Sequence, residues 1–138
     1  MTETEVPRLE EAAILQFPAG LPGFPGMRRF ALQQLVEDSA FQLLESVDGD
    51  GVSMVVTRPW LFFPDYAPEI QDEDQDELRL VRPEDAIVFC PVSIDREAGN
   101  IYINLRGPLV VNATTREGRQ VVLEEDLPLR AVIEVDTY

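Results

Sequence analysis

The sequence predicts an all-β protein, a small antiparallel β-barrel-like domain with at most one or two short helical segments. Three observations support this prediction. Short apolar runs recur along the chain, eleven prolines and eight glycines break them into short pieces, and some runs alternate apolar with polar residues. Short strands at regular spacing, with turn signals between them, are typical of antiparallel barrels and sandwiches.

The strands are expected where apolar runs lie between turn residues. The glycine-rich pattern at 48–51 is a strong hairpin signal, and the run that contains Pro91 suggests a bulge or an exposed edge. A second hairpin turn is expected at 116–119, and residues 127–138 are apolar but weakly patterned. The predicted strands are 13–17, 29–35, 41–47, 52–57, 86–94, 101–105, 109–113 and 121–123.

Two further segments are apolar but too rich in proline for regular structure. Residues 17–26 hold three prolines and three glycines, yet Leu21 and Phe24 predict that this loop packs against the protein. Residues 59–66 form an aromatic cluster closed by prolines. This cluster is either a plug at one end of the core or an aromatic anchor for a protein partner. Asp65 and Tyr66 have polar tips and are expected to face outward.

The acidic run 72–77 predicts one short helix over 72–80, with Asp72 as its N-cap and Pro83 beyond its end. Its spacing does not fit a calcium-binding EF-hand loop, because position 6 is Glu77 instead of glycine and position 12 is a proline. We therefore interpret the run as a solvated acidic face and predict no metal site.

Composition excludes most familiar catalytic schemes. The chain has no histidine and no lysine, and its single cysteine, Cys90, lies in an apolar run without a base to activate it. The 26 acidic and 11 basic residues give a formal net charge of −15. Such a charge repels nucleic-acid phosphates and favours basic protein partners, although it also fits a requirement for solubility alone. No cofactor is predicted.

Length and patterning predict a loose N-terminal arm at 1–10 followed by one domain at 11–138. The polar, acidic start shows neither the positive region nor the apolar core of a signal peptide. No apolar run approaches the roughly 20 residues of a membrane span. A lone cysteine fits a reducing compartment, so a cytoplasmic location is expected, without contact to a membrane.

Five motifs follow one another along the chain. They are Phe17-x-x-Gly20-Leu21-Pro22-Gly23-Phe24, Phe41-x-Leu43-Leu44-x-Ser46-x-Asp48, Pro59-x-x-Phe62-x-Pro64-Asp65-Tyr66, Asn104-Leu105-x-x-Pro108-Leu109-x-x-Asn112 and Gly118-x-Gln120-Val121-x-Leu123. In this order and spacing, over about residues 14–124, they resemble the flagellar assembly factor family (FliW). The resemblance implies a small cytosolic, non-enzymatic, barrel-like protein.

The resemblance also implies two alternating partners. One is newly made flagellin, for which such a protein acts as an export-related chaperone. The other is the carbon storage regulator (CsrA), a basic RNA-binding dimer that represses flagellin translation and that the free factor sequesters. Direct nucleic-acid binding is not implied, and the protein alone is expected to be a monomer.

Eight residues are the candidate partner-binding positions, and no catalytic, cofactor or metal position is predicted. Leu21, Phe24, Phe63 and Tyr66 are the candidate apolar groove for flagellin. Two alternatives from other classes stay open: a carboxylate-based hydrolase, and a structural β module that oligomerises through strand edges. The eight positions are Phe17, Leu21, Phe24, Phe63, Asp65, Tyr66, Asn104 and Asn112.

Overall fold

The structure, a computed structural model, describes residues 14–21, 26, 28–34, 40–47 and 51–133. The predicted arm at 1–10 and most of the hairpin turn at 48–51 fall outside these residues. The strands are β1 (Ile14–Gln16), β2 (Arg29–Gln34), β3 (Phe41–Ser46), β4 (Ser53–Thr57), β5 (Ala86–Asp95), β6 (Asn100–Ile103), β7 (Leu109–Asn112), β8 (Gly118–Gln120) and β9 (Ala131–Ile133). The helices are η1 (Pro59–Leu61), α2 (Asp72–Glu77) and η2 (Pro83–Asp85), of which η1 and η2 are single 3₁₀ turns.

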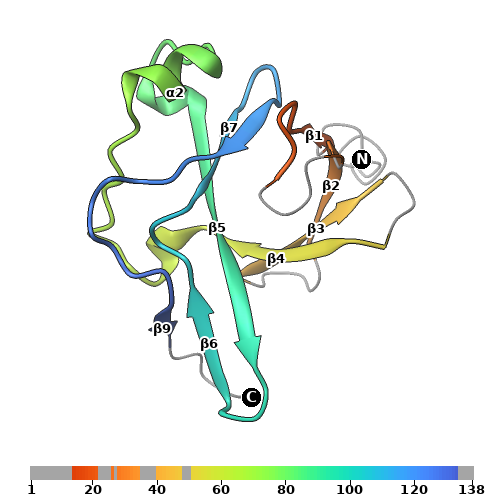
Figure 1. The fold of residues 1–138 in the computed structure, drawn as a ribbon, viewed down its shortest axis with the longest axis vertical. Helices are drawn as coiled ribbons and strands as arrows, with labels where there is room; N and C mark the ends of the chain where they lie inside the picture. The colour runs from red at the N-terminus through yellow and green to blue at the C-terminus, as the bar shows by residue number, and fades with distance from the viewer. Residues whose placement is uncertain (1–13, 22–25, 27, 35–39, 48–50, 134–138) are drawn as a thin grey trace, which may run out of the picture.

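The strands form one antiparallel network, which confirms the predicted fold class. The main path runs β1-β2-β3-β4-β5-β6-β9, and β7 branches from β5 to pair with β8. Figure 1 shows β5 running the length of the molecule, with α2 near one end and the turn into β6 at the other. The first part of β5 pairs with β7 and the last part with β6, so this one strand joins the two halves of the sheet.

One contact brings the two ends of the path β1-β2-β3-β4-β5-β7-β8 together. Gln16 of β1 forms a single parallel bridge with Glu117, next to β8, and its N–H donates to the Arg116 carbonyl at 2.9 Å. No longer ladder closes this ring in the part of the chain that the structure describes. The two ends of this path therefore meet at one bridge only, without a barrel-closing ladder among the described residues.

Pro91 lies inside β5, where the sequence predicted a bulge or an exposed edge. The ladder to β7 ends at Phe89 and the ladder to β6 begins at Val92. Pro91 falls in the gap between them, and its carbonyl accepts from the Asn104 N–H at 2.9 Å. Proline has no N–H to give to a ladder, and Pro91 lies where this edge of β5 changes its partner from β7 to β6. On the other edge β5 pairs with β4, with Pro91 opposite Val56.

Side chains of β5 alternate between two core clusters, because successive strand residues face opposite sides. Val88 and Cys90 belong to the first cluster, whereas Phe89 belongs to the second. The first cluster also contains Tyr66, Leu78, Ile103, Leu105, Val110, Val121, Leu123 and Ile133. The second also contains Leu15, Phe17, Leu21, Phe30, Leu44, Val56, Leu109 and Val111. Burial on both faces explains the continuous apolar run of β5.

Three predicted elements differ in the structure. The predicted strand 121–123 is not a strand: Val121 and Leu123 are buried and donate singly to the carbonyls of Pro108 and Arg106. The strand there is β8 at 118–120, and its turn comes earlier than predicted, at 113–115. The weakly patterned end contains β9, which pairs with β6.

Helix α2 begins and ends differently from the prediction. Its N-cap is Gln71, which makes no side-chain cap, and Asp72 is the first helical residue. The helix ends well before Pro83, because Arg79 adopts the left-handed conformation at φ 55°. The Leu80 N–H donates to the Gln75 carbonyl at 2.9 Å. This pattern is a Schellman motif, in which a left-handed residue closes the last turn.

Candidate functional site

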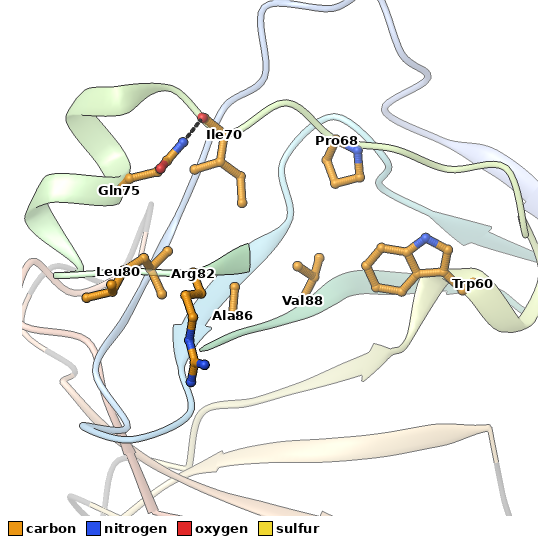
Figure 2. Close-up of a pocket in the computed structure, with 9 residues that line it drawn as sticks. Trp60, Pro68, Ile70, Gln75, Leu80, Arg82, Ala86 and Val88 are labelled. Atoms are coloured by element: carbon orange, nitrogen blue, oxygen red, sulfur yellow. Dashed lines mark hydrogen bonds between the residues drawn. The ribbon is translucent and has the colours of Figure 1, made fainter. Parts of the chain in front are cut away.

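An apolar hollow of about 370 Å³ lies between α2 and η1, and Figure 2 shows the side chains around it. Its floor is the start of β5, where Ala86 and Val88 lie. Its walls come from η1, from the chain leading into α2, from α2 itself and from the chain leaving it. These wall residues are Trp60, Pro68, Ile70, Gln75, Leu80, Val81 and Arg82.

Trp60 forms one wall of the hollow, and contacts with Tyr66 hold its side chain in place. Its indole N–H donates to the Tyr66 carbonyl at 2.6 Å, and the two rings lie 5.8 Å apart at 55°. Pro59 at the start of η1 favours the turn that presents Trp60, since its fixed φ suits a helix start. The tryptophan nevertheless stays 37% exposed. A large, fixed and partly exposed aromatic side chain is the type that anchors protein partners.

The facing wall depends on Gln75 of α2. Its side-chain amide donates to the Ile70 carbonyl at 2.8 Å, shown as the dashed line in Figure 2, which ties the helix to the chain that leads into it. On the other side of the helix, Arg119 of β8 lies 3.4 Å from Asp74 and 3.7 Å from Glu77. These contacts fix the helix at the rim of the hollow.

Asn112 fixes the end of α2. It is buried, and its side-chain amide donates to the carbonyl of Leu78 at 2.8 Å and to that of Arg79 at 3.3 Å. Its side-chain oxygen accepts from the N–H groups of Thr114 and Thr115. One side chain therefore joins the end of the helix to the turn after β7. We conclude that Asn112, predicted as a partner contact, has a structural task here.

Asn104 forms a similar local turn without a connection to the helix. Its side-chain oxygen accepts from the N–H groups of Arg106 at 3.0 Å and Gly107 at 2.9 Å. It is half-buried. Both asparagines of the fourth motif thus shape the backbone two and three residues further on.

Some residues of the aromatic cluster at 59–66 are buried, as expected for a core plug, and others are exposed, as expected for a partner anchor. Tyr66 is buried, and the expectation that it faces outward is wrong, because its hydroxyl donates to the Leu105 carbonyl at 2.6 Å. Asp65 is exposed, as expected, and Phe63 is half-buried against the first core cluster. Trp60 and Leu61 reach solvent, at 37% and 61% exposure. The cluster is core on one side and surface on the other.

The structure does not bring the predicted partner-binding residues together at one place. Phe17 and Leu21 are buried in the second core cluster, whereas Tyr66 lies in the first. Phe24 lies outside the described residues. Partner binding by the set stays a prediction. The hollow itself was missed, except for Trp60, because its lining residues are spread over 60–88 and share no local pattern.

The buried polar groups near the hollow favour binding over chemistry. Burial raises the pKa of the Cys90 thiol to about 12, although the hydrogen bond with Tyr66 opposes this rise. Burial, and next the neighbouring Cys90, raise the pKa of the Tyr66 hydroxyl above its usual range. Both groups stay protonated at neutral pH, so neither is an activated nucleophile. Among the described residues, no cluster of three acidic or cysteine side chains has the arrangement of a metal site.

Comparison with known proteins decides the family. A profile described as "FliW protein" matches residues 2–133. The chain belongs to the FliW family. It is 35% identical over 115 residues to flagellar assembly factor FliW of Clostridium beijerinckii, covering 83% of this chain and 82% of that protein. It is 36% identical over 112 residues to flagellar assembly factor FliW of Moorella thermoacetica, covering 80% and 71%.

The fold agrees with a solved FliW structure. A crystal structure of the flagellar assembly factor FliW matches with a TM-score of 0.77 and 27% identity, over 88% of this chain and 84% of the other. This chain is thus a flagellar assembly factor of the FliW family, and the resemblance read from the five motifs is confirmed. FliW proteins are non-enzymatic, which sets the hydrolase alternative aside. No helix in the described part of the chain is long and apolar enough to span a bilayer.

Proposed function

We propose that this FliW protein binds newly made flagellin as an export-related chaperone and, alternately, binds the carbon storage regulator (CsrA). Binding of the regulator then relieves translational repression of flagellin. Family membership is the observation that carries this proposal. We also propose that it acts as a cytoplasmic monomer with a single domain at 11–138.

The charge of the protein supports the regulator as a partner. An RNA-binding protein must present positive surface to phosphates, and a partner with a formal net charge of −15 is attracted to such a surface. The attraction is long-range and therefore sensitive to salt, since the Debye length falls to about 8 Å at physiological ionic strength. The 11 arginines are the only basic side chains of the sequence and are outnumbered by 26 acidic ones, so the overall interaction with a positive surface is attractive.

The apolar hollow supports capture of flagellin, whose assembly segments are amphipathic helices. Such helices bind by placing an apolar face into a groove. Trp60 and Val81 line the hollow and keep part of their apolar surface uncovered, and Leu61, next to Trp60 in η1, is exposed as well. Of the candidate positions from the sequence, Phe63 and Asp65 reach the surface of the same aromatic segment.

Calorimetry with purified flagellin and purified regulator from the same organism tests the proposal. We expect each to bind, the two to compete, and the affinity for the regulator to weaken as salt rises. Light scattering of the free protein should give the mass of one chain, 15.5 kDa. Absence of binding to the regulator at low salt would refute that half of the proposal, and simultaneous binding of both partners would refute alternation.

A further inference from the structure

The rim of the hollow combines apolar surface with unpaired negative charge. From residue 67 to residue 86 the chain carries eight carboxylates and two arginines. Asp74 and Glu77 pair with Arg119, and Asp85 pairs with Arg82 at 3.5 Å. The remaining carboxylates form no ion pair with any residue that the structure describes. They are Glu69, Asp72, Glu73, Asp76 and Glu84.

The unpaired carboxylates are placed next to the hollow by helix geometry. Gln75 lines the hollow. Viewed down the helix axis, the side chain of Asp72 is rotated by about 60° from that of Gln75, and the side chain of Asp76 by about 100° in the same sense. Asp72 and Asp76 are four residues apart, so their Cβ atoms lie about 5–6 Å from each other on one face. Leu78 and Asp74 face the protein instead. Asp72 and Asp76 are both exposed and lie on the solvent side of Gln75, beside the hollow, where they can pair with charged side chains of a segment whose apolar side chain enters it.

Both arginines of this segment are paired with carboxylates, Arg79 with Glu117 and Arg82 with Asp85. Arg82 lines the hollow, but its guanidinium lies beside the Asp85 carboxylate, and the Asp85 carboxylate also accepts from the Arg82 N–H at 3.2 Å. The electrostatic field at the opening is therefore negative. An occupant with an apolar side chain and positive neighbours matches both properties, whereas an acidic occupant is repelled.

We propose that the hollow binds a basic amphipathic polypeptide segment. One bulky apolar side chain of the segment enters between Trp60 and Leu80, and lysine or arginine side chains spaced four residues apart pair with Asp72 and Asp76. A hollow of about 370 Å³ lies within the ~300–1,000 Å³ range of binding pockets and is large enough to take one bulky apolar side chain. The proposal rests on the function proposed above, because it names the kind of segment that a partner presents.

The intrinsic fluorescence of Trp60 can report binding at the hollow. Trp60 is the sole tryptophan of the chain and forms a wall of the hollow. A segment that covers it should shift its fluorescence to shorter wavelength. The probe is a synthetic helical peptide with leucines at positions i, i+3 and i+7 and lysines flanking them, titrated into the full-length protein. A peptide with every lysine replaced by glutamate is the control.

We expect saturable binding of the lysine peptide that weakens with salt, and at least tenfold weaker binding of the glutamate peptide. The double variant Asp72→Asn/Asp76→Asn should weaken the lysine peptide about fivefold or more. The variant Glu97→Gln/Glu124→Gln removes the same charge from exposed positions away from the hollow and should change binding less than twofold.

Two further variants test the hollow separately from the charge. Ala86→Leu fills the floor and should weaken binding about tenfold or more. Val81→Ser removes an apolar contact at a side chain that is 87% exposed, so the fold is expected to survive it. Equal binding of both peptides, or no larger effect of the four hollow substitutions than of the control pair, would overturn the proposal.

The same variants separate this proposal from the proposed function. If flagellin and the regulator bind the wild-type protein and bind every hollow variant equally well, the segment proposal is wrong while the function stands. If neither partner binds the wild-type protein, the function is wrong, and the peptide titration alone decides what the hollow accepts.

Discussion

Replacing Asn112 by alanine tests whether the wall of the hollow depends on one buried side chain. The substitution leaves the Leu78 carbonyl unpaired in a buried position, at a cost of about 1–3 kcal/mol. It also removes two hydrogen bonds to N–H groups in an exposed turn, each with a net value of about 0.5–1.5 kcal/mol. We expect a loss of about 3 kcal/mol in the free energy of unfolding.

Asn104→Ala is the matched control for this substitution. Asn104 accepts from N–H groups two and three residues further on, as Asn112 does, but no side-chain bond to α2 accompanies them. It should cost about 1–2 kcal/mol. The difference between the two variants isolates the connection from Asn112 to the end of the helix.

Urea unfolding, followed by circular dichroism, measures both losses at constant m value. For a chain of this length, 3 kcal/mol corresponds to a fall of about 10 °C in Tm. The Asn112→Ala protein should also bind the lysine peptide more weakly, since α2 forms a wall of the hollow. If Asn112→Ala is no less stable than Asn104→Ala, the connection to the helix adds nothing and the reasoning is refuted.

The substitution Asn112→Asp should make the free energy of unfolding depend on pH, which tests the same connection to α2. The new carboxylate would face the carbonyls of Leu78 and Arg79 in a buried position, so its pKa in the folded protein should rise above the ~3.9 of the unfolded chain. The protonated carboxyl can donate to the Leu78 carbonyl. Stability from this group is therefore present below the unfolded pKa and is lost as pH rises through the folded pKa. Asn112→Asp should approach wild type relative to Asn112→Ala at low pH, and parallel pH profiles of the two variants would contradict this.

Three other predictions concern single positions. Gly118→Ala should destabilise the protein by about 2 kcal/mol or more in urea unfolding, because an added Cβ would lie 2.9 Å from the Val110 carbonyl, and unchanged stability would contradict the packing. Arg79→Gly should be about 1 kcal/mol more stable than Arg79→Ala, since both lose the ion pair with Glu117 but glycine alone accepts the left-handed backbone without strain. The Cys90 thiol, whose pKa burial raises from 9.0 to about 12, should resist thiol reagents at pH 8 until the protein unfolds. Its contribution to stability is full below pH 9 and falls as pH rises towards 12, so Cys90→Ala should flatten the alkaline loss of stability.

Local pattern in the sequence was enough for most of the fold. Alternation placed Ile101 and Ile103 on one face of a strand, and turn residues bounded most of the strands close to their observed limits. Local pattern gave the wrong secondary structure for Val121 and Leu123, which are apolar and buried but do not belong to a strand. A buried irregular segment has the same composition as a strand, and only its hydrogen-bond partners differ.

The sequence by itself determined the class of this protein and the character of its surface. Charge and the missing histidine depend on composition alone, and the five motifs that gave the family depend on order and spacing. Only the tertiary structure decided where a hollow forms on that surface. Trp60, Gln75 and Ala86 line one hollow because η1, α2 and the start of β5 border the same space, and Asn112 bonds to a carbonyl 34 residues away. Such contacts are set by packing between distant segments, so no local stretch of sequence carries their signal.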